Sequence, residues 1–389
     1  MTDGPWDVWL AQALARLDRA EQRRSLHAIS PSGAVEARRD GRDLVLFATN
    51  DYLGLSVHPE VRAAASEAAL AHGMGPRGAA LVAGYTDAHR DLEEALARLE
   101  RTESALLFPT GFAANSAVIA ALADAELEVF SDALNHASIV DGCRMARRLG
   151  ATVTVYPHRD TARLGELLTA SRAGRKLVVT DAVFSMDGTL APLVELVALR
   201  ERHGALLVVD EAHATLVFGP HGGGLADALG VADGVDIHVG TLSKAFGALG
   251  GFAATTRVLR DWLLNRARPF VFSTALPLPV VAAARAALDV ATRSSDVRDR
   301  LWARVAQLAG ALGRRLECPV VPIAATSEAH ALAASRALLE RGLFVPAIRP
   351  PTVPAGGSRL RIALSAAHTE AQVARLASAL AELGLAGRY

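Results

Sequence analysis

Residues 206–213 read Leu-Leu-Val-Val-Asp-Glu-Ala-His, and this stretch is the clearest indication of the fold. Four apolar residues in a row are typical of a strand that is buried on both faces, as strands of parallel sheets are. The run ends at Asp210, and His213 follows three residues later. Because ligands bind beyond the carboxyl ends of parallel strands, we expect both side chains to lie at a ligand site.

The same pattern continues on both sides of this stretch. Six further short runs rich in β-forming residues occupy 105–108, 128–131, 152–156, 177–180, 236–240 and 251–255. Helical patterns fill intervening segments such as 111–123, 136–150 and 192–204. Strands that alternate with helices predict an α/β fold, with a large, mostly parallel sheet covered by helices on both faces.

The pattern changes after Pro277. A long helical region runs to about residue 315 and is followed by a strand at 319–323, a helix at 328–341, a strand at 359–364 and a helix from Thr369. This order predicts a smaller α+β domain. We therefore expect an N-terminal segment over 1–55 with an amphipathic helix in 6–24, a large domain over 56–285 and a small C-terminal domain over 286–389.

Composition excludes several classes of protein. The net charge is zero and the pI is about 7.2, which argues against a nucleic-acid binder. The only cysteines, Cys143 and Cys318, are far apart, so we expect neither a disulfide scaffold nor a thiolate metal site, and a cytoplasmic protein. No apolar run reaches the ~18–20 residues of a membrane span. The N-terminus lacks the pattern of a signal peptide.

Lysine is rare in this chain. It accounts for two of the 41 basic side chains, and Lys244 lies in Thr241-Leu-Ser-Lys-Ala-Phe-Gly-Ala-Leu-Gly-Gly251 among small and apolar neighbours. Of the two basic side chains, only that of lysine can lose its proton and attack a carbonyl, because arginine stays charged. Lys244 is therefore a candidate Schiff-base residue. Lys176, beside Arg175 before a strand, is more typical of a surface charge.

Three other strand ends carry polar groups. Gly111 opens a helix after the run at 105–108, where main-chain N–H groups can hold a phosphate. His136 follows the run at 128–131, and Ser185 lies in Val183-Phe-Ser-Met-Asp-Gly188. Each of these, taken alone, is also explained as an ordinary turn or a structural histidine.

The letters Asp210-Glu-Ala-His213 also spell a helicase box. That function requires a phosphate loop of the form GxxxxGK[ST], and the chain contains no Gly-Lys pair. The chain instead meets the needs of pyridoxal phosphate, which are a lysine amine, a carboxylate, N–H groups that bind phosphate, and hydroxyl or imidazole donors. Asp210, placed 34 residues before Lys244, would face the pyridine nitrogen.

Four segments in order resemble the α-oxoamine synthases: Asn50-Asp-Tyr-Leu-Gly-Leu55, Val183–Gly188, Asp210–His213 and Thr241-Leu-Ser-Lys244. These fold-type I pyridoxal-phosphate enzymes condense an amino acid with an acyl thioester and release CO2. The tail at 348–356 is most similar to the branch of biotin biosynthesis, which joins L-alanine to a pimeloyl thioester of coenzyme A or a carrier protein. Glycine C-acetyltransferase, 5-aminolevulinate synthase and an inactive scaffold subunit remain alternatives.

The resemblance implies a role for each matching residue. It implies that Lys244, His136 and Asp210 are catalytic. The implied cofactor contacts are His136 on the ring, His213 and Ser185 at the phenolic oxygen, Gly111, Phe112 and Thr241 at the phosphate, and Ser273 or Thr274 from the partner of a homodimer. The implied substrate contacts are Arg349 at the carboxylate, Thr352, Asn50, and Arg24 at the acyl group.

The chain departs from the family pattern in two places. Gly75-Pro-Arg-Gly-Ala-Ala80 stands where the family has a Gly/Ser-rich loop, and Leu216 stands where it has glycine. Pro76 removes a main-chain donor, and we expect Leu216 to avoid the positive φ that glycine allows.

Overall fold

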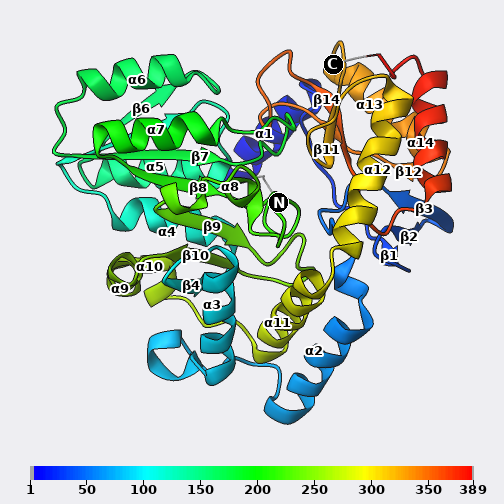
Figure 1. Ribbon diagram of the computed structural model, residues 1–389. Coiled ribbons are helices and arrows are strands. Elements are labelled where there is room, and N and C mark those ends of the chain that lie inside the picture. Colours follow the sequence, from blue (N-terminus) through cyan, green and yellow to red (C-terminus); the bar gives the residue numbers. More distant parts are fainter. Residues whose placement is uncertain (1–3, 388–389) are drawn as a thin grey trace. The chain divides into compact units, whose positions relative to one another are not determined.

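A computed structural model describes residues 4–387 of the chain (Figure 1). The described residues form two compact units. One is Asn50–Trp302, and the other combines the described parts of Met1–Thr49 and Ala303–Tyr389. The two units divide after residues 49 and 302. The domain boundaries predicted at residues 55 and 285 stay predictions.

A seven-stranded sheet forms the centre of the unit Asn50–Trp302. Its strands are β4 (Ser104–Phe108), β5 (Leu127–Asp132), β6 (Thr152–Tyr156), β7 (Arg175–Asp181), β8 (Leu206–Asp210), β9 (Ile237–Thr241) and β10 (Gly251–Thr255), in the order β4-β10-β9-β8-β7-β5-β6. The predicted α/β class with a mostly parallel sheet is confirmed. The exception is β10, which is antiparallel to both of its neighbours because the connection 242–250 is too short for a parallel crossover.

Both faces of this sheet are buried. Val208, Ile237 and Val239 pack in one core with α4 (Gly111–Ala121) and α5 (Ala137–Arg148). The alternate residues, such as Leu207 and His238, point to the opposite face and are also buried. Figure 1 shows β7, β8 and β9 side by side in the middle of the sheet, which explains the uninterrupted apolar run of β8.

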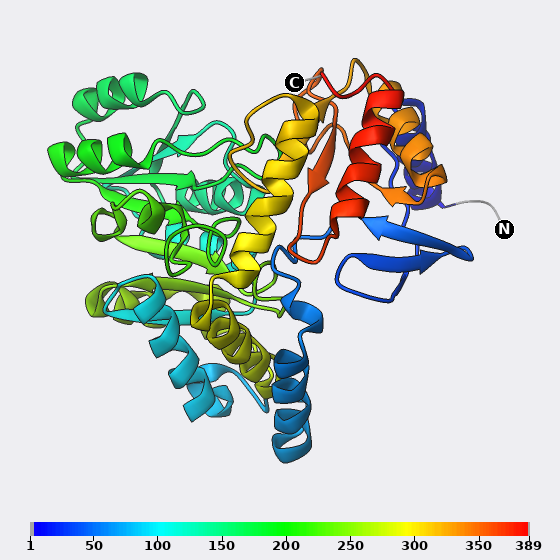
Figure 2. The ribbon, with the colours of Figure 1, turned by 45° about the vertical axis from the view of Figure 1, so that its right-hand side comes forward.

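Helices and short turns complete this unit. They are η1 (Leu55–Val57), α2 (Pro59–His72), the π-helical turn η2 (Ala80–Gly84), α3 (Asp87–Leu99), α6 (Thr161–Ala170), α7 (Leu193–His203), α8 (Gly224–Ala228), η3 (Ala232–Gly234), α9 (Arg257–Arg266), α10 (Arg268–Val271) and α11 (Leu278–Arg293). α2 lies against α11 in both views (Figures 1 and 2). The long helix predicted after Pro277 is interrupted, because Ser294 is extended and α12 (Asp296–Leu312) starts anew after it.

The second unit contains two small sheets. Its elements are α1 (Pro5–Arg19), β1 (Ser30–Pro31), β2 (Glu36–Arg39), β3 (Arg42–Leu46), β11 (Val320–Ala324), α13 (Glu328–Glu340), β12 (Leu343–Phe344), β13 (Ala347–Ile348), β14 (Arg359–Ala363) and α14 (Glu370–Glu382). The sheets are ordered β1-β2-β3-β12 and β11-β14-β13. β3 and β12 pair in parallel, so N-terminal and C-terminal segments share one sheet. Phe47 stacks on His368 with 4.3 Å between ring centroids.

Two further observations concern the whole described range. Cys143 and Cys318 are buried, and burial raises the pKa of their thiols to about 11 and about 12. Across residues 4–387, no helix has both the length and the apolar character to span a membrane.

Candidate active site

Three strand ends bring the central polar groups together. Asp210 ends β8 and is paired in register with Asp181, which ends β7. Lys244 follows the end of β9 by three residues. Burial raises the pKa of Asp181 and lowers the pKa of His136, and the positive charge of Lys244 opposes the first shift and adds to the second, so its ammonium group lies near both.

Asp210 is buried, and both of its carboxyl oxygens accept hydrogen bonds. Its Oδ2 accepts a hydrogen bond from Asn115 Nδ2 at 2.6 Å, and its Oδ1 accepts one from the main-chain N–H of Ala212 at 2.8 Å. Burial, and then the charge of Asp210, raise the pKa of Asp181 well above its usual range. The two carboxyl groups therefore lie side by side at the ends of neighbouring strands.

Tyr52, which the sequence did not indicate as a site residue, holds His213. Tyr52 is completely buried, and its hydroxyl oxygen lies 2.6 Å from His213 Nδ1. The same hydroxyl lies 3.4 Å from Asn50 Oδ1. The turn that carries Tyr52 packs closely on the loop of Lys244, because a Cβ on Gly247 would lie 2.2 Å from the main-chain nitrogen of Ser56. Tyr52 thus sets the orientation of the His213 ring.

His136 caps the start of α5. Its main-chain N–H donates to Asp181 Oδ2 at 2.7 Å, and its Nδ1 accepts from the main-chain N–H of Ser138 at 3.2 Å. Burial is the main effect that lowers the pKa of His136, and Lys244 adds to it while Asp210 opposes it. The imidazole is therefore neutral near pH 7. Phe112 lies edge-on to this ring, with centroids 6.4 Å apart.

The start of α4 provides donors for an anion. The first N–H groups of a helix have no partner within the helix, and here Thr110 Oγ1 satisfies that of Ala113 at 3.0 Å. Gly111 allows close packing, since a Cβ there would lie 3.0 Å from Thr241 Cβ. The Thr241 hydroxyl donates to the Gly250 carbonyl oxygen at 2.9 Å. Its proton is therefore engaged in this conformation, and its contact with a phosphate stays a prediction.

Ser185 lies in a tight turn after β7. The Gly188 N–H donates to the Phe184 carbonyl oxygen at 2.8 Å, and Gly188 has a φ of +65°. The turn leaves Ser185 half-buried. Its predicted contact with the phenolic oxygen of a cofactor stays a prediction.

Three of the predicted substrate residues meet within the second unit. Arg24 Nη2 donates to Thr352 Oγ1 at 3.0 Å, although 328 positions separate the two residues. The Thr352 N–H donates to the Arg349 carbonyl oxygen at 3.0 Å, and the Arg349 guanidinium donates to the Glu21 carbonyl oxygen. Two guanidinium groups and a hydroxyl therefore lie close together, a combination suited to anionic oxygen.

The two departures from the family pattern have distinct structures. Leu216 has a φ of +65°, so the expectation that it avoids positive φ is wrong. Its side chain is completely buried, and its N–H donates to the Gly222 carbonyl oxygen at 2.7 Å, so surrounding contacts outweigh the strain. In the loop 75–80, Arg77 has a φ of +64°, and the Gly78 N–H donates to the Pro76 carbonyl oxygen at 2.8 Å.

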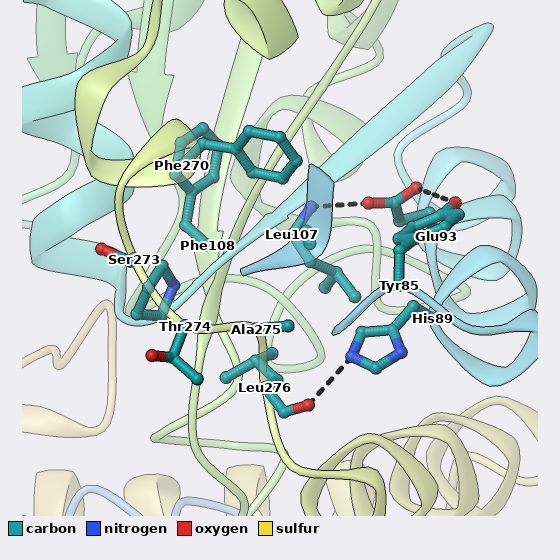
Figure 3. Close-up of a pocket in the computed structure, with 12 residues that line it drawn as sticks. Tyr85, His89, Glu93, Leu107, Phe108, Phe270, Ser273, Thr274, Ala275 and Leu276 are labelled. Atoms are coloured by element: carbon teal, nitrogen blue, oxygen red, sulfur yellow. Dashed lines mark hydrogen bonds between the residues drawn. The ribbon is translucent and has the colours of Figure 1, made fainter. Parts of the chain in front are cut away.

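A small pocket lies beside the segment Ser273–Leu276 (Figure 3). Its volume of about 20 Å³ suits one water molecule and excludes an organic substrate. One wall is polar: Glu93 accepts from the Tyr85 hydroxyl at 2.7 Å and from the Leu107 N–H at 2.9 Å. His89 Nε2 lies 2.9 Å from the Leu276 carbonyl oxygen and anchors the segment that carries Ser273 and Thr274.

These groups fit pyridoxal phosphate. Asp210 is a buried carboxylate, which a protonated pyridine nitrogen would stabilise. The start of α4 offers N–H groups to a phosphate, next to a glycine where a Cβ would crowd Thr241. Lys244 supplies the amine and His213 a donor or acceptor.

Comparison with known proteins agrees with this chemistry. The model of the family "Aminotransferase class I and II" matches residues 42–380. The chain is 52% identical over 389 residues to the 8-amino-7-oxononanoate synthase of Anaeromyxobacter dehalogenans, with 97% of each chain covered. Serine palmitoyltransferase of Sphingomonas wittichii has a TM-score of 0.90 at 35% identity, covering 97% of this chain and 98% of that one. An 8-amino-7-oxononanoate synthase from Francisella tularensis has a TM-score of 0.74 at 26% identity, covering 87% and 97%. The chain therefore belongs to the aminotransferase class I and II family, and its relatives there include the 8-amino-7-oxononanoate synthases.

Proposed function

We propose that the protein catalyses the condensation of L-alanine with a pimeloyl thioester in biotin biosynthesis. The products are 8-amino-7-oxononanoate, CO2 and the free thiol. The observation that carries this function is the position of buried Asp210, Lys244 and His213 just beyond the ends of two neighbouring strands, in a chain 52% identical to a synthase of that name.

The cofactor is pyridoxal phosphate, and when bound it supplies an aldehyde for a lysine amine and a protonated ring that takes up negative charge. Lys244 would bond to it and, once released, would take the proton from the α-carbon of alanine at Nζ. Asp210 would keep the pyridine nitrogen protonated. The neutral His136 ring would lie on the cofactor, and His213 and Ser185 would hold its phenolic oxygen. The N–H groups of Gly111 and Phe112, with the Thr241 hydroxyl, would bind its phosphate.

The overall reaction balances without an added oxidant or reductant. The α-carbon of alanine loses its proton and forms a bond with the thioester carbonyl carbon, and the thiol leaves. The carboxyl group of alanine then leaves as CO2, and a proton replaces it. We propose that Arg349 binds the alanine carboxylate, that Thr352 and Asn50 line the substrate site, and that Arg24 binds the acyl substrate. The contact of Arg24 with Thr352 supports the grouping of two of them.

We also propose a homodimer in which Ser273 or Thr274 completes the phosphate site of the partner. The segment that carries them is anchored on its C-terminal side, by the Ala275 N–H on the Gly78 carbonyl oxygen at 3.1 Å and by His89 on Leu276. Next to this segment, Phe272 is 70% exposed and Val82 is 84% exposed. Large exposed apolar side chains near a functional segment are typical of an interface.

A charge on this surface tests the dimer. We expect Val82→Glu to yield a monomer in light scattering with weaker cofactor binding. Val258→Glu, at an equally exposed valine of α9, should remain dimeric. A monomeric wild-type protein, or a dimer that persists in Val82→Glu, would refute the interface. We further propose a cytoplasmic location, which the presence of only two cysteines, far apart in the sequence, supports.

A panel of substrates tests the reaction. L-alanine, glycine and L-serine are each combined with pimeloyl, acetyl, succinyl and palmitoyl thioesters, and the products are identified by mass spectrometry. We expect alanine and the pimeloyl thioester to give the highest kcat/KM. Pimeloyl groups on coenzyme A and on a carrier protein, assayed in parallel, identify the carrier. Faster turnover of glycine with the acetyl or succinyl thioester would contradict the proposed function.

A further inference from the structure

A chain of hydrogen bonds connects Asp210 to His136. Asn115 Nδ2 donates to Asp210 Oδ2 at 2.6 Å and to Ser138 Oγ at 2.9 Å. Ser138 Oγ in turn lies 2.7 Å from His136 Nδ1. Asn115 and Ser138 are 2% and 0% exposed, so water does not compete for these bonds. The four residues come from α4, α5 and the end of β8, which the chain separates widely.

The main-chain N–H of Ser138 decides the direction of these bonds. It lies 3.2 Å from His136 Nδ1, and an N–H group can only donate. Nδ1 must therefore carry a lone pair, because a proton there would place two N–H groups against each other. The Ser138 hydroxyl accepts from Asn115, so its own proton is available to Nδ1. The single proton of the neutral ring then resides on Nε2.

The other end of the chain is equally constrained. Both protons of the Asn115 amide are used, one on Asp210 and one on Ser138. The opposite orientation of the amide would place its oxygen against the Asp210 carboxylate, which is repulsive. Asn115 therefore presents one N–H donor to Asp210 and the other to Ser138.

We propose that Asn115 and Ser138 are positioning residues that hold His136 in its Nε2–H tautomer and link its ring to Asp210. This inference rests on the proposed function only for the statement that His136 and Asp210 face the cofactor. The Nε2–H group can donate to a carbonyl or carboxylate oxygen of a bound substrate, and it cannot take up a proton there. Proton removal is thus left to Lys244.

Nitrogen NMR tests the tautomer directly. The full chain is labelled with ¹⁵N-histidine, and His136→Gln identifies the two signals of His136 among those of the 12 histidines. We expect Nδ1 to resonate as an unprotonated nitrogen and Nε2 as a protonated one, both without cofactor and in the loaded protein. The reverse assignment in the wild type would overturn the inference, whatever the variants do.

Variants test the role of the serine. We expect Ser138→Ala to give a mixture of tautomers and a cofactor dissociation constant raised about 5-fold, the factor that one neutral hydrogen bond contributes. Ser138→Thr should restore the Nε2–H form. Ser131→Ala is a matched control, because Ser131 Oγ is also buried and also accepts from an asparagine, Asn135, at 2.9 Å, without contacting His136.

The outcomes separate this inference from the proposed function. Equal changes of the His136 signals in Ser138→Ala and Ser131→Ala would refute the role of Ser138. A wild type with the expected tautomer that forms no 8-amino-7-oxononanoate would refute the proposed function and leave the inference standing. A wild type that forms the product with the proton on Nδ1 would do the opposite.

Discussion

Leu216 is a buried leucine with a φ of +65°, and replacing it separates strain from burial. We expect Leu216→Ala and Leu216→Gly both to lower the free energy of unfolding. We also expect the glycine variant to be the more stable of the two. At an ordinary buried leucine the order is reversed, because glycine gives the unfolded chain more conformational freedom than alanine does.

Two magnitudes give this order. Removing a buried leucine side chain costs about 2–5 kcal/mol, which both variants lose. A left-handed residue with a Cβ costs about 1–2 kcal/mol, which alanine retains and glycine relieves. The entropy cost of glycine is about 0.5–1 kcal/mol and offsets part of that relief. The glycine variant should therefore be more stable than the alanine variant by up to about 1.5 kcal/mol, and less stable than the wild type.

Urea unfolding followed by circular dichroism measures this difference. The control is the same pair of substitutions at Leu288, a buried residue inside α11, where alanine should be the more stable variant. If alanine at position 216 is as stable as glycine or more stable, the left-handed strain is not what the geometry implies and the reasoning is wrong. A glycine variant more stable than the wild type would show that burial of Leu216 contributes little.

Three further predictions concern other positions. Tyr52→Phe removes the hydroxyl partner of buried His213 Nδ1, and we expect kcat/KM to fall about 5- to 100-fold; an unchanged kcat/KM contradicts this. Gly247→Ala should lower the urea midpoint far more than Gly204→Ala. Both glycines have positive φ, but only at Gly247 would the new Cβ lie 2.2 Å from a main-chain nitrogen. Equal effects of the two substitutions would show that the loop moves to accommodate the Cβ. Burial lowers the pKa of His368 to about 4, so the folded state binds fewer protons than the unfolded state between about pH 4 and 6.5, and the free energy of unfolding falls as pH decreases through that range. His368→Asn should remove up to about 3 kcal/mol of this pH dependence. Parallel pH profiles of the free energy of unfolding in the variant and the wild type would refute the prediction.

Much of the central sheet could be predicted from the sequence, because its strands are buried on both faces and therefore apolar throughout. Predicted run and observed strand coincide at 152–156 and 251–255, and differ by one to two residues elsewhere. The strands β2 and β3 were not predicted, since Glu36–Arg39 and Arg42–Leu46 begin with charged residues and lack a clear alternation. The antiparallel direction of β10 depends on the length of its connection rather than on its residues.

The candidate site was predictable where its chemistry is unusual for a protein surface. Lys244 and Asp210 are recognisable from their neighbours, whereas Asp181 and Tyr52 act through partners that are far away in sequence. One signal for Asn115 was present: it lies four residues after Gly111, on the same face of the helix. The positive φ of Leu216 left no signal, because only its surroundings impose it.

Locating the lysine that bonds to the cofactor is the most direct test of the role assigned to Lys244. The chain has only two lysines, so the protein is incubated with pyridoxal phosphate, treated with borohydride to make the bond permanent, and digested for mass spectrometry. We predict that the reduced cofactor is attached to the peptide containing Lys244, and that Lys244→Ala carries none. Attachment to Lys176, or to no lysine at all, would contradict the assignment of this site.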